Sequence, residues 1–356
     1  MMSSSHCCPG IVSPELLRSV ARHGSDEQRS RALSTLAVDA TWRLVRATTP
    51  LDRRPPALTT PPSREPQRAI SDAGGTEQLP GRLVRSEGAD PSGDPAVDEA
   101  YDGLGSTFAM LLGAYGRYSI DDEGLPLGAT VHFGEAYDNA FWNGERMVFG
   151  GGDGELFARF TASLDVIGHE LGHGVIADEA NLRYSDEPGA LNESLADVIG
   201  SLVKQYTLNQ TAEQADWLIG AELLLPGVQG RALRDMAAPG TAYDDPVLGK
   251  DPQVAHLEDY VRTASDNGGV HLNSGIPNRA FQLAATALGG FAWEGAGRLW
   301  YDALRDPRVR AGTRFAGFAA ATVRAATLRF GVDSEQVEKV TTAWSTVGVL
   351  PGATGR

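Results

Sequence analysis

Two histidines four residues apart carry the strongest chemical signal in this chain. His169 and His173 enclose Glu170 in an H-E-x-x-H string, within a segment whose apolar residues recur at helical spacing. Residues four apart share one face of a helix, so both imidazoles can bind one metal ion while the glutamate lies beside it. The alternative is an ordinary amphipathic helix with two histidines on its polar face.

A second helical pattern follows about twenty residues after His173 and carries two carboxylates, Glu193 and Asp197. The apolar positions of this pattern are Leu191, Leu195, Val198, Leu202 and Tyr206. A catalytic zinc ion typically has three protein ligands and one open position, and two histidines with a glutamate form a common set. Glu193 would complete this set, and Asp197 would accept a hydrogen bond from a zinc-binding imidazole. The alternative is a pair of solvated carboxylates on a helix surface.

Four motifs in order give the chain a resemblance to a known family. They are NAFWNG at 139–144, the HELGH string, GALNES at 189–194 and DNGGVHLNSG at 266–275. Together they resemble the thermolysin family of zinc metallopeptidases (gluzincins), and more closely its protealysin-like branch. The resemblance implies an α+β fold with two lobes and a zinc-bearing helix at the base of the cleft between them.

The resemblance also assigns roles at the reaction centre. His169, His173 and Glu193 would bind one zinc ion, Asp197 would support a ligand, and Glu170 would be the general base toward water. The family's donors to the tetrahedral oxyanion match Tyr184 and His271, and Asp266 would orient His271. Outside the DNGGVHLNSG string, a single histidine in a Gly-rich stretch would more often be a surface residue.

Substrate binding follows from the same resemblance. Asn139 and the backbone of Ala140 match the strand that pairs with an extended peptide, and Arg234 matches an arginine that contacts a substrate carbonyl. The apolar pocket after the cleaved bond corresponds to Phe157, Phe160, Val166, Ile219 and Leu233. We therefore expect cleavage before Leu, Phe, Ile or Val. Each pocket residue could equally belong to the hydrophobic core.

The first 67 residues differ from the rest of the chain. One helical pattern begins at Ser13, and a second begins at Ser25, where Gln28 completes a capping box. Six prolines then occur between residues 49 and 66. By resemblance, residues 1–50 are a helical propeptide that inhibits the enzyme, and residues 51–67 are a Pro-rich linker in which the precursor cleaves itself. Whether Cys7 or Cys8 contacts the zinc in the precursor stays open.

The remaining sequence predicts a β-rich part followed by a helical part. Extended runs at 129–133 and 146–149 predict strands, and helical periodicity dominates from Ser163 onward, with Ala-rich stretches at 279–288 and 315–328. We place the β-rich N-terminal lobe, including the H-E-x-x-H helix, at residues 68–180. The α-helical C-terminal lobe follows at 181–356.

Charge and composition exclude several classes of function. The net charge is −15, and the only basic segment is the arginine-rich N-terminal part, so binding to nucleic acid is not expected. No apolar run is long enough to span a membrane, and no Sec signal peptide is evident. The resemblance favours secretion by a non-classical route; otherwise the protein would be cytoplasmic. Peptides and proteins would be the substrates.

The double calcium site of better-known family members does not carry over to this sequence. Asp165 and Asp216 match two of its carboxylates, but Lys204, Leu218 and Ala221 stand at other positions of that site. Calcium requires several oxygen ligands, which an ammonium group would repel. We predict that the double site is absent, while calcium binding elsewhere stays open.

Three hypotheses follow for the function. The first is an active zinc endopeptidase made as a self-processing precursor. The second is a zinc-bound, catalytically inactive binding or regulatory protein, against which the presence of Glu170, Tyr184, His271 and Asp266 argues. The third is a zinc hydrolase that acts on a non-peptide bond, which the peptide-pairing string around Asn139 disfavours.

Overall fold

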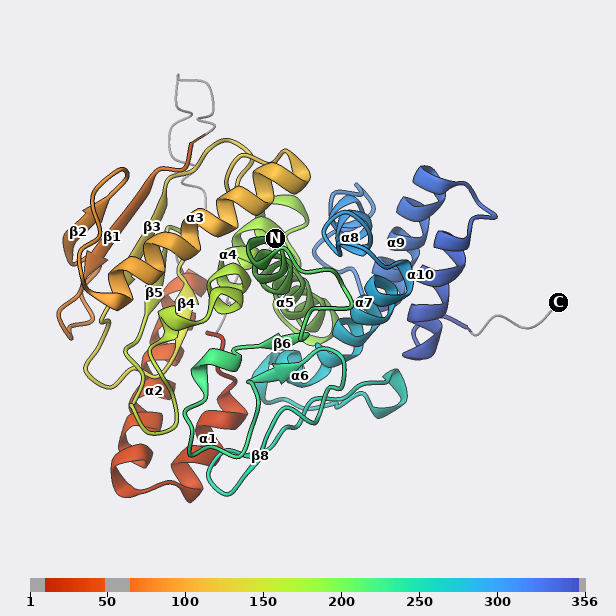
Figure 1. The fold of residues 1–356 in the computed structure, drawn as a ribbon. Helices are drawn as coiled ribbons and strands as arrows, with labels where there is room; N and C mark the ends of the chain where they lie inside the picture. The colour runs from red at the N-terminus through yellow and green to blue at the C-terminus, as the bar shows by residue number, and fades with distance from the viewer. Residues whose placement is uncertain (1–9, 49–64, 352–356) are drawn as a thin grey trace.

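A computed structural model describes residues 10–48 and 65–351 of the chain (Figure 1). Its first two helices are α1 (Pro14–His23) and α2 (Asp26–Thr48). The side chain of Ser13 accepts a hydrogen bond from the backbone of Leu16 at the start of α1. At the start of α2, Ser25 and Gln28 cap each other, with N–O distances of 2.9 and 3.2 Å. Both predicted helices are present, whereas Cys7, Cys8 and most of the predicted linker lie outside the described residues.

A five-stranded mixed sheet forms the next layer. Its strands are β1 (Arg68–Asp72), β2 (Arg82–Ser86), β3 (Leu127–Val131), β4 (Ala140–Trp142) and β5 (Arg146–Phe149), in the order β2-β1-β3-β5-β4. The pairs β1–β3 and β3–β5 are parallel, and the outer pairs are antiparallel. Helix α3 (Pro95–Tyr115) covers one face of the sheet (Figure 1). Strand β4 is at the edge, so its outer backbone groups are available to another extended chain.

Two central helices, α4 (Leu164–Glu179) and α5 (Asp186–Leu208), carry the metal motif and the carboxylate pair. They cross closely because glycines lie at their contact. A Cβ atom added to Gly200 would lie 2.2 Å from the carbonyl oxygen of Asp165, and one added to Gly168 would lie 3.0 Å from the Cα of Gly200. Helical glycine costs about 1 kcal/mol relative to alanine. Here the absence of side chains at these glycines permits the close packing that brings the two motifs together, and this packing offsets the cost.

Helices dominate the C-terminal half after a long irregular region. That region contains β6 (Leu218–Ile219), β7 (Arg234–Asp235), β8 (Asp244–Asp245) and β9 (Gly249–Lys250). The helices are α6 (Asp266–Asn273), α7 (Gly275–Leu288), α8 (Ala296–Leu304), α9 (Phe315–Phe330) and α10 (Glu335–Thr346). One continuous hydrophobic core runs from Ile11 to Val349 and includes the stacked rings of Trp300 and Trp344. The α+β prediction is therefore confirmed, and the two parts of the catalytic region share a core.

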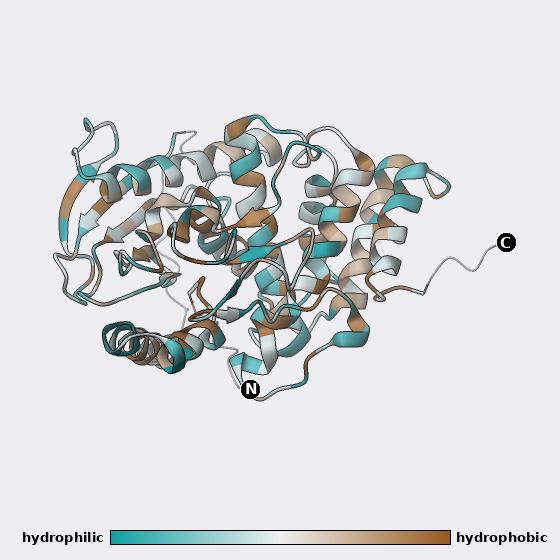
Figure 2. Ribbon diagram, turned by 60° about the horizontal axis from the view of Figure 1, so that its bottom comes forward, coloured by the Kyte–Doolittle hydropathy of each residue, from teal (hydrophilic) through white to brown (hydrophobic). Residues whose placement is uncertain are grey.

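The helices mix hydrophilic and hydrophobic residues along their length (Figure 2). Among the described residues, no helix has both the length and the apolar character needed to cross a membrane.

Candidate active site

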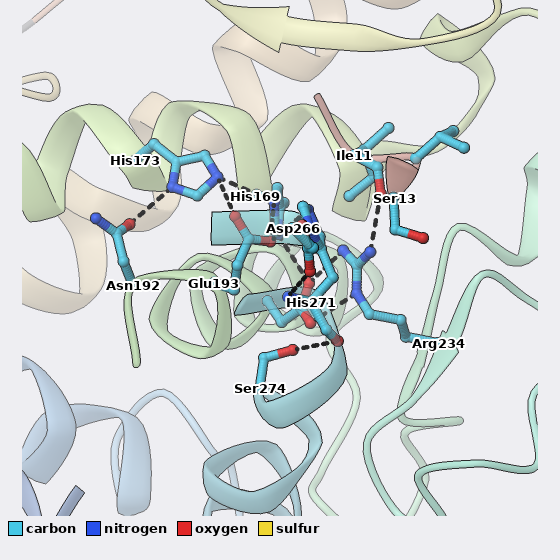
Figure 3. A network of polar contacts seen from close by, with 12 residues as sticks. Ile11, Ser13, His169, His173, Asn192, Glu193, Arg234, Asp266, His271 and Ser274 are labelled. Atoms are coloured by element: carbon cyan, nitrogen blue, oxygen red, sulfur yellow. Dashed lines mark hydrogen bonds and ion pairs between the residues drawn. The ribbon is translucent and has the colours of Figure 1, made fainter. Parts of the chain in front are cut away.

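The predicted metal ligands converge between α4 and α5. The Nε2 atoms of His169 and His173 lie 3.1 Å apart, and the Glu193 carboxylate lies 3.6 and 3.4 Å from these two atoms (Figure 3). All potential ligand atoms lie within 4.8 Å of one another, and all three side chains are buried. Two imidazole nitrogens and one carboxylate match the donor set of a catalytic zinc site.

Hydrogen bonds behind the histidines orient them toward this centre. His169 Nδ1 lies 2.8 Å from Asp197 Oδ1, and His173 Nδ1 lies 2.8 Å from Asn192 Oδ1. An Nδ1–H that donates to these acceptors leaves the Nε2 lone pair for a metal ion. Burial lowers the pKa of His173 to about 4, which also favours the neutral ligand form. The residues therefore fit zinc. Asn192 received no role from the sequence, although it directly precedes Glu193.

Glu170 lies beside the metal ligands and contacts the edge strand. Its Oε2 accepts a hydrogen bond of 3.0 Å from the backbone N–H of Trp142 in β4. The carboxylate is buried, so this bond fixes its position between the metal ligands and the strand that would hold a peptide. A general base must lie within reach of the proton that it takes, and this position is compatible with the role predicted for Glu170.

His271 is brought to the centre by a sharp turn at the start of α6. Asn267, Gly268 and Gly269 have φ values of 50°, 92° and 76°. This turn lets Asp266 accept hydrogen bonds from both the backbone N–H and the Nδ1 of His271, at 2.8 and 2.7 Å. His271 Nε2 lies 3.4 Å from Glu193 Oε2. Glycine tolerates positive φ at no steric cost, which explains the two glycines of the motif.

Electrostatics favour a charged imidazole at this position. Burial lowers the pKa of His271, but the carboxylates of Asp266 and Glu193 outweigh burial and raise this pKa to about 9. The Tyr184 hydroxyl donates a hydrogen bond to Glu193 Oε1. Tyr184 was predicted to be an oxyanion donor, and its hydroxyl does lie at the same centre, although its partner here is a metal ligand.

The predicted peptide-binding residues hold the chain's own N-terminal segment. The backbone N–H of Ile11 donates to the carbonyl of Ala140 at 3.1 Å, and the carbonyl of Ile11 accepts from Arg234 at 2.9 Å. The side-chain amide of Asn139 pairs with both backbone groups of Val12, at 2.9 and 3.3 Å. Figure 3 shows Arg234 pointing to Ile11. Residues 11 and 12 thus occupy the place predicted for an extended substrate.

Arg234 also links this segment to the metal ligands. Its guanidinium donates to both carboxylate oxygens of Asp197, at 2.9 and 2.7 Å, and Asp197 in turn contacts His169. Two parallel bonds of this kind fix a guanidinium in one orientation.

The five residues predicted for the apolar pocket are all buried. They belong to the hydrophobic core cluster, in which the rings of Phe157 and Phe160 have centroids 6.1 Å apart. Leu233 lines a cavity together with Ile11. Burial is what both the pocket and the core interpretations require, so the pocket stays a prediction.

Lys204 lies inside the carboxylate group that was compared with a calcium site. Its ammonium is 3.1 Å from Asp165, 3.0 Å from Asp216 and 3.4 Å from Glu222. Burial opposes the charge of Lys204, but Asp165 and Glu222 raise its pKa above the usual value. Glu222 received no role from the sequence, although its neighbour Ala221 was compared with the same site.

Comparisons with known proteins agree with this geometry. The chain matches the models of the thermolysin metallopeptidase catalytic domain over residues 63–177 and of its alpha-helical domain over residues 180–349. It is 52% identical over 348 residues to an extracellular metalloprotease of Pectobacterium carotovorum subsp. carotovorum, covering 98% of each chain. It is 45% identical over 346 residues to Protease PrtS of Photorhabdus sp. (strain Az29), covering 96% of this chain and 92% of that protein.

A solved structure of a thermolysin-like precursor has a similar fold. The precursor of protealysin, a metalloproteinase from Serratia proteamaculans, superposes with a TM-score of 0.88 at 53% identity, covering 96% of this chain and 100% of that one. Fold and site define a zinc metalloendopeptidase. The chain belongs to the thermolysin family of metallopeptidases and is similar to protealysin within it.

Proposed function

We propose that this metalloendopeptidase is made as an autoinhibited precursor whose N-terminal residues occupy the substrate site. The observation that carries the proposal is the set of backbone contacts of Ile11 and Val12 with Ala140, Asn139 and Arg234. The segment lies beside β4 and forms one backbone hydrogen bond with it, from Ile11 to Ala140, as a peptide substrate would. Cleavage in the linker at 51–67 would then allow residues 1–50 to leave the cleft.

The chain's own residues divide the catalytic work. Zinc held by His169, His173 and Glu193 would supply a Lewis acid at the reaction centre. Glu170 takes the proton from the attacking water and passes it to the leaving amine. His271, charged and oriented by Asp266, donates from Nε2 toward the oxyanion, and Tyr184 supplies a second donor.

The bound segment also suggests the orientation and specificity of substrates. Arg234 contacts the carbonyl of Ile11, as predicted for a substrate carbonyl, and we assign Ile11 to the position directly after the cleaved bond. Ile11 is apolar, consistent with the predicted cleavage before Leu, Phe, Ile or Val. Gly10 would then occupy the position before the bond.

Peptides that differ only at this position test the specificity. We expect kcat/KM to be at least about tenfold higher with Leu than with Ala after the cleaved bond, because the pocket buries the larger side chain. Removal of zinc by a chelator should abolish both rates, and readdition should restore them. Equal rates for the two peptides, or cleavage by the metal-free protein, would rule out this specificity and the metal dependence respectively.

Gly10 provides a test of autoinhibition. A Cβ atom at residue 10 would lie 2.2 Å from the carbonyl oxygen of Ala140 and 2.5 Å from Asn139 Oδ1. We expect Gly10→Val to displace the segment and to tighten binding of a Leu-containing peptide to the precursor by about tenfold, since the binding-competent fraction rises. The measurement is a fluorescence titration of precursor that also carries Glu170→Gln, which prevents processing.

Gly312→Val is the matched control, because a Cβ atom there meets nothing within 4 Å. It should leave the peptide affinity unchanged. If Gly10→Val binds the peptide no more tightly than this control, the N-terminal segment does not block the cleft.

We further propose that the enzyme acts outside the cell. Relatives from Pectobacterium carotovorum and Serratia marcescens are named extracellular metalloproteases. The export route stays a prediction; detection of the processed enzyme in the culture medium of intact cells would support secretion.

A further inference from the structure

A small cavity separates the N-terminal segment from the wall of the cleft. Its volume is about 20 Å³, and Val12 and Ser13 line one side of it. The opposite wall includes Leu233, Tyr243 and Gln253. The cavity therefore lies directly beyond the position at which Arg234 holds the carbonyl of Ile11.

Gln253 lines the cavity and carries a side-chain acceptor that is not hydrogen-bonded to any described residue. Its side chain is 8% exposed, and its Nε2 donates to the carbonyl of His271 at 2.9 Å and to Ser274 Oγ at 3.0 Å. The Ser274 hydroxyl itself donates to the His271 carbonyl. Both neighbours therefore need a donor from Gln253, which fixes the amide orientation. Its Oε1 accepts no hydrogen bond from any described residue.

None of the other polar groups that line the cavity donates to this oxygen. The carboxylate of Asp251 accepts three backbone N–H groups, from Gly240, Ala242 and Gln253, at 3.0 to 3.1 Å. Val12 has no donor in its side chain, and the hydroxyls of Ser13 and Tyr243 make no hydrogen bond to Gln253 Oε1. A buried acceptor without a donor is unfavourable, so Oε1 favours a ligand that brings one.

We propose that Gln253 is a specificity-determining residue of a second substrate subsite. This proposal rests on the proposed function, because it places substrate where Ile11 to Ser13 lie in the precursor. The subsite receives the second or third residue after the cleaved bond. It selects a side chain with an apolar stem, which packs on Leu233 and Tyr243, and a hydrogen-bond donor at its tip, which reaches Gln253 Oε1. Glutamine and lysine have this form.

The test compares two peptides in each of two enzymes. The peptides carry Leu directly after the cleaved bond and differ only in Gln against Met, at the second and then at the third following residue. With the processed wild-type enzyme we expect kcat/KM to be about 3–10-fold higher for the Gln peptide at one of these positions, the effect of one hydrogen bond. In Gln253→Met the ratio should fall to about one.

The ratio of the rates for the Gln and Met peptides separates side-chain selectivity from an effect of Gln253 on the position of His271. Loss of the contact between Gln253 and the His271 carbonyl lowers both rates together and cancels in the ratio. Gln205→Met makes the same chemical change in a buried glutamine of α5 that contacts Ser201, and it should keep the wild-type ratio. A wild-type ratio of one at both positions, or a Gln253→Met ratio equal to wild type, overturns the proposal while the peptidase activity stands. Failure to cleave any of the peptides overturns the proposed function as well.

Discussion

Replacing Glu170 by Gln is expected to lower kcat/KM for a Leu-containing peptide by about 10²–10⁴-fold, the usual contribution of a general base. The amide keeps the size of the side chain but cannot take a proton from water. Glu170 is not among the proposed metal ligands, so the variant should retain its zinc. Steady-state kinetics of the purified proteins give kcat/KM, and elemental analysis gives their zinc content.

Linker cleavage in the purified precursor provides a second readout of the same change. The Glu170→Gln precursor should remain intact under conditions in which the wild type processes itself. Glu213→Gln, on the exposed surface, should behave as the wild type. If Glu170→Gln processes itself and cleaves peptide at the wild-type rate, Glu170 is not the base. If the wild type also fails in both assays, the catalytically inactive alternative is favoured.

Replacing Lys204 by Met is expected to lower the free energy of unfolding by about 3 kcal/mol, because it leaves the carboxylate of Asp165 buried without its cation. Asp165 is fully buried, and among the described residues it would keep hydrogen bonds from Ser163 and the backbone of Gly220 alone. It lies in the first turn of α4, so the helix that carries both histidines is destabilised directly. Denaturant unfolding in the Glu170→Gln background, which prevents self-digestion, gives the value.

A partly exposed lysine supplies the control. Lys339 pairs with Glu335 one turn away on α10, and surface pairs of this kind contribute less than about 1 kcal/mol. Lys339→Met should therefore have a small effect, and equal losses for the two variants would show that Lys204 is not a structural counterion.

Lys204 also underlies the prediction about calcium. Because its ammonium lies among Asp165, Asp216 and Glu222, we expect the melting temperature of the wild type to be unchanged by a calcium-selective chelator. A clear decrease in melting temperature that is lost in Asp216→Asn would contradict the predicted absence of the double site.

The sequence predicted the centre of the site well because helical spacing is local. The positions of His169, His173 and Glu193 on two helices follow from the four-residue period and the apolar pattern, and their convergence came from the family resemblance. The α+β class was predictable from the strand and helix patterns of the sequence and from the same resemblance. The resemblance also indicated that Asn139, Ala140 and Arg234 bind an extended chain.

Contacts between distant segments could not be read from the pattern. Nothing in the sequence indicates that Trp142 donates to Glu170, that Asn192 supports His173, or that residues 11 and 12 are the ones held by Asn139. These pairs arise from packing of elements far apart in the chain. The sequence predicted a propeptide that covers the cleft, but it did not indicate which propeptide residues contact the cleft residues.

Local backbone geometry produced two smaller differences. The extended run predicted at 129–133 ends as a strand at Val131, because His132 has a φ of 51° and leaves the β region. The Gly-rich stretch around His271 forms a short helix after its turn of positive φ. In both places the side-chain pattern is compatible with more than one backbone path.

The presence of one zinc ion shared by two histidines and a glutamate is the claim on which the account depends. Anomalous diffraction at the zinc edge from crystals of the processed, active enzyme tests it directly. We expect a single strong peak at about 2.0–2.2 Å from His169 Nε2, His173 Nε2 and a Glu193 carboxylate oxygen. Absence of a peak at this position in fully active protein, or a peak bound by other residues, would contradict the account.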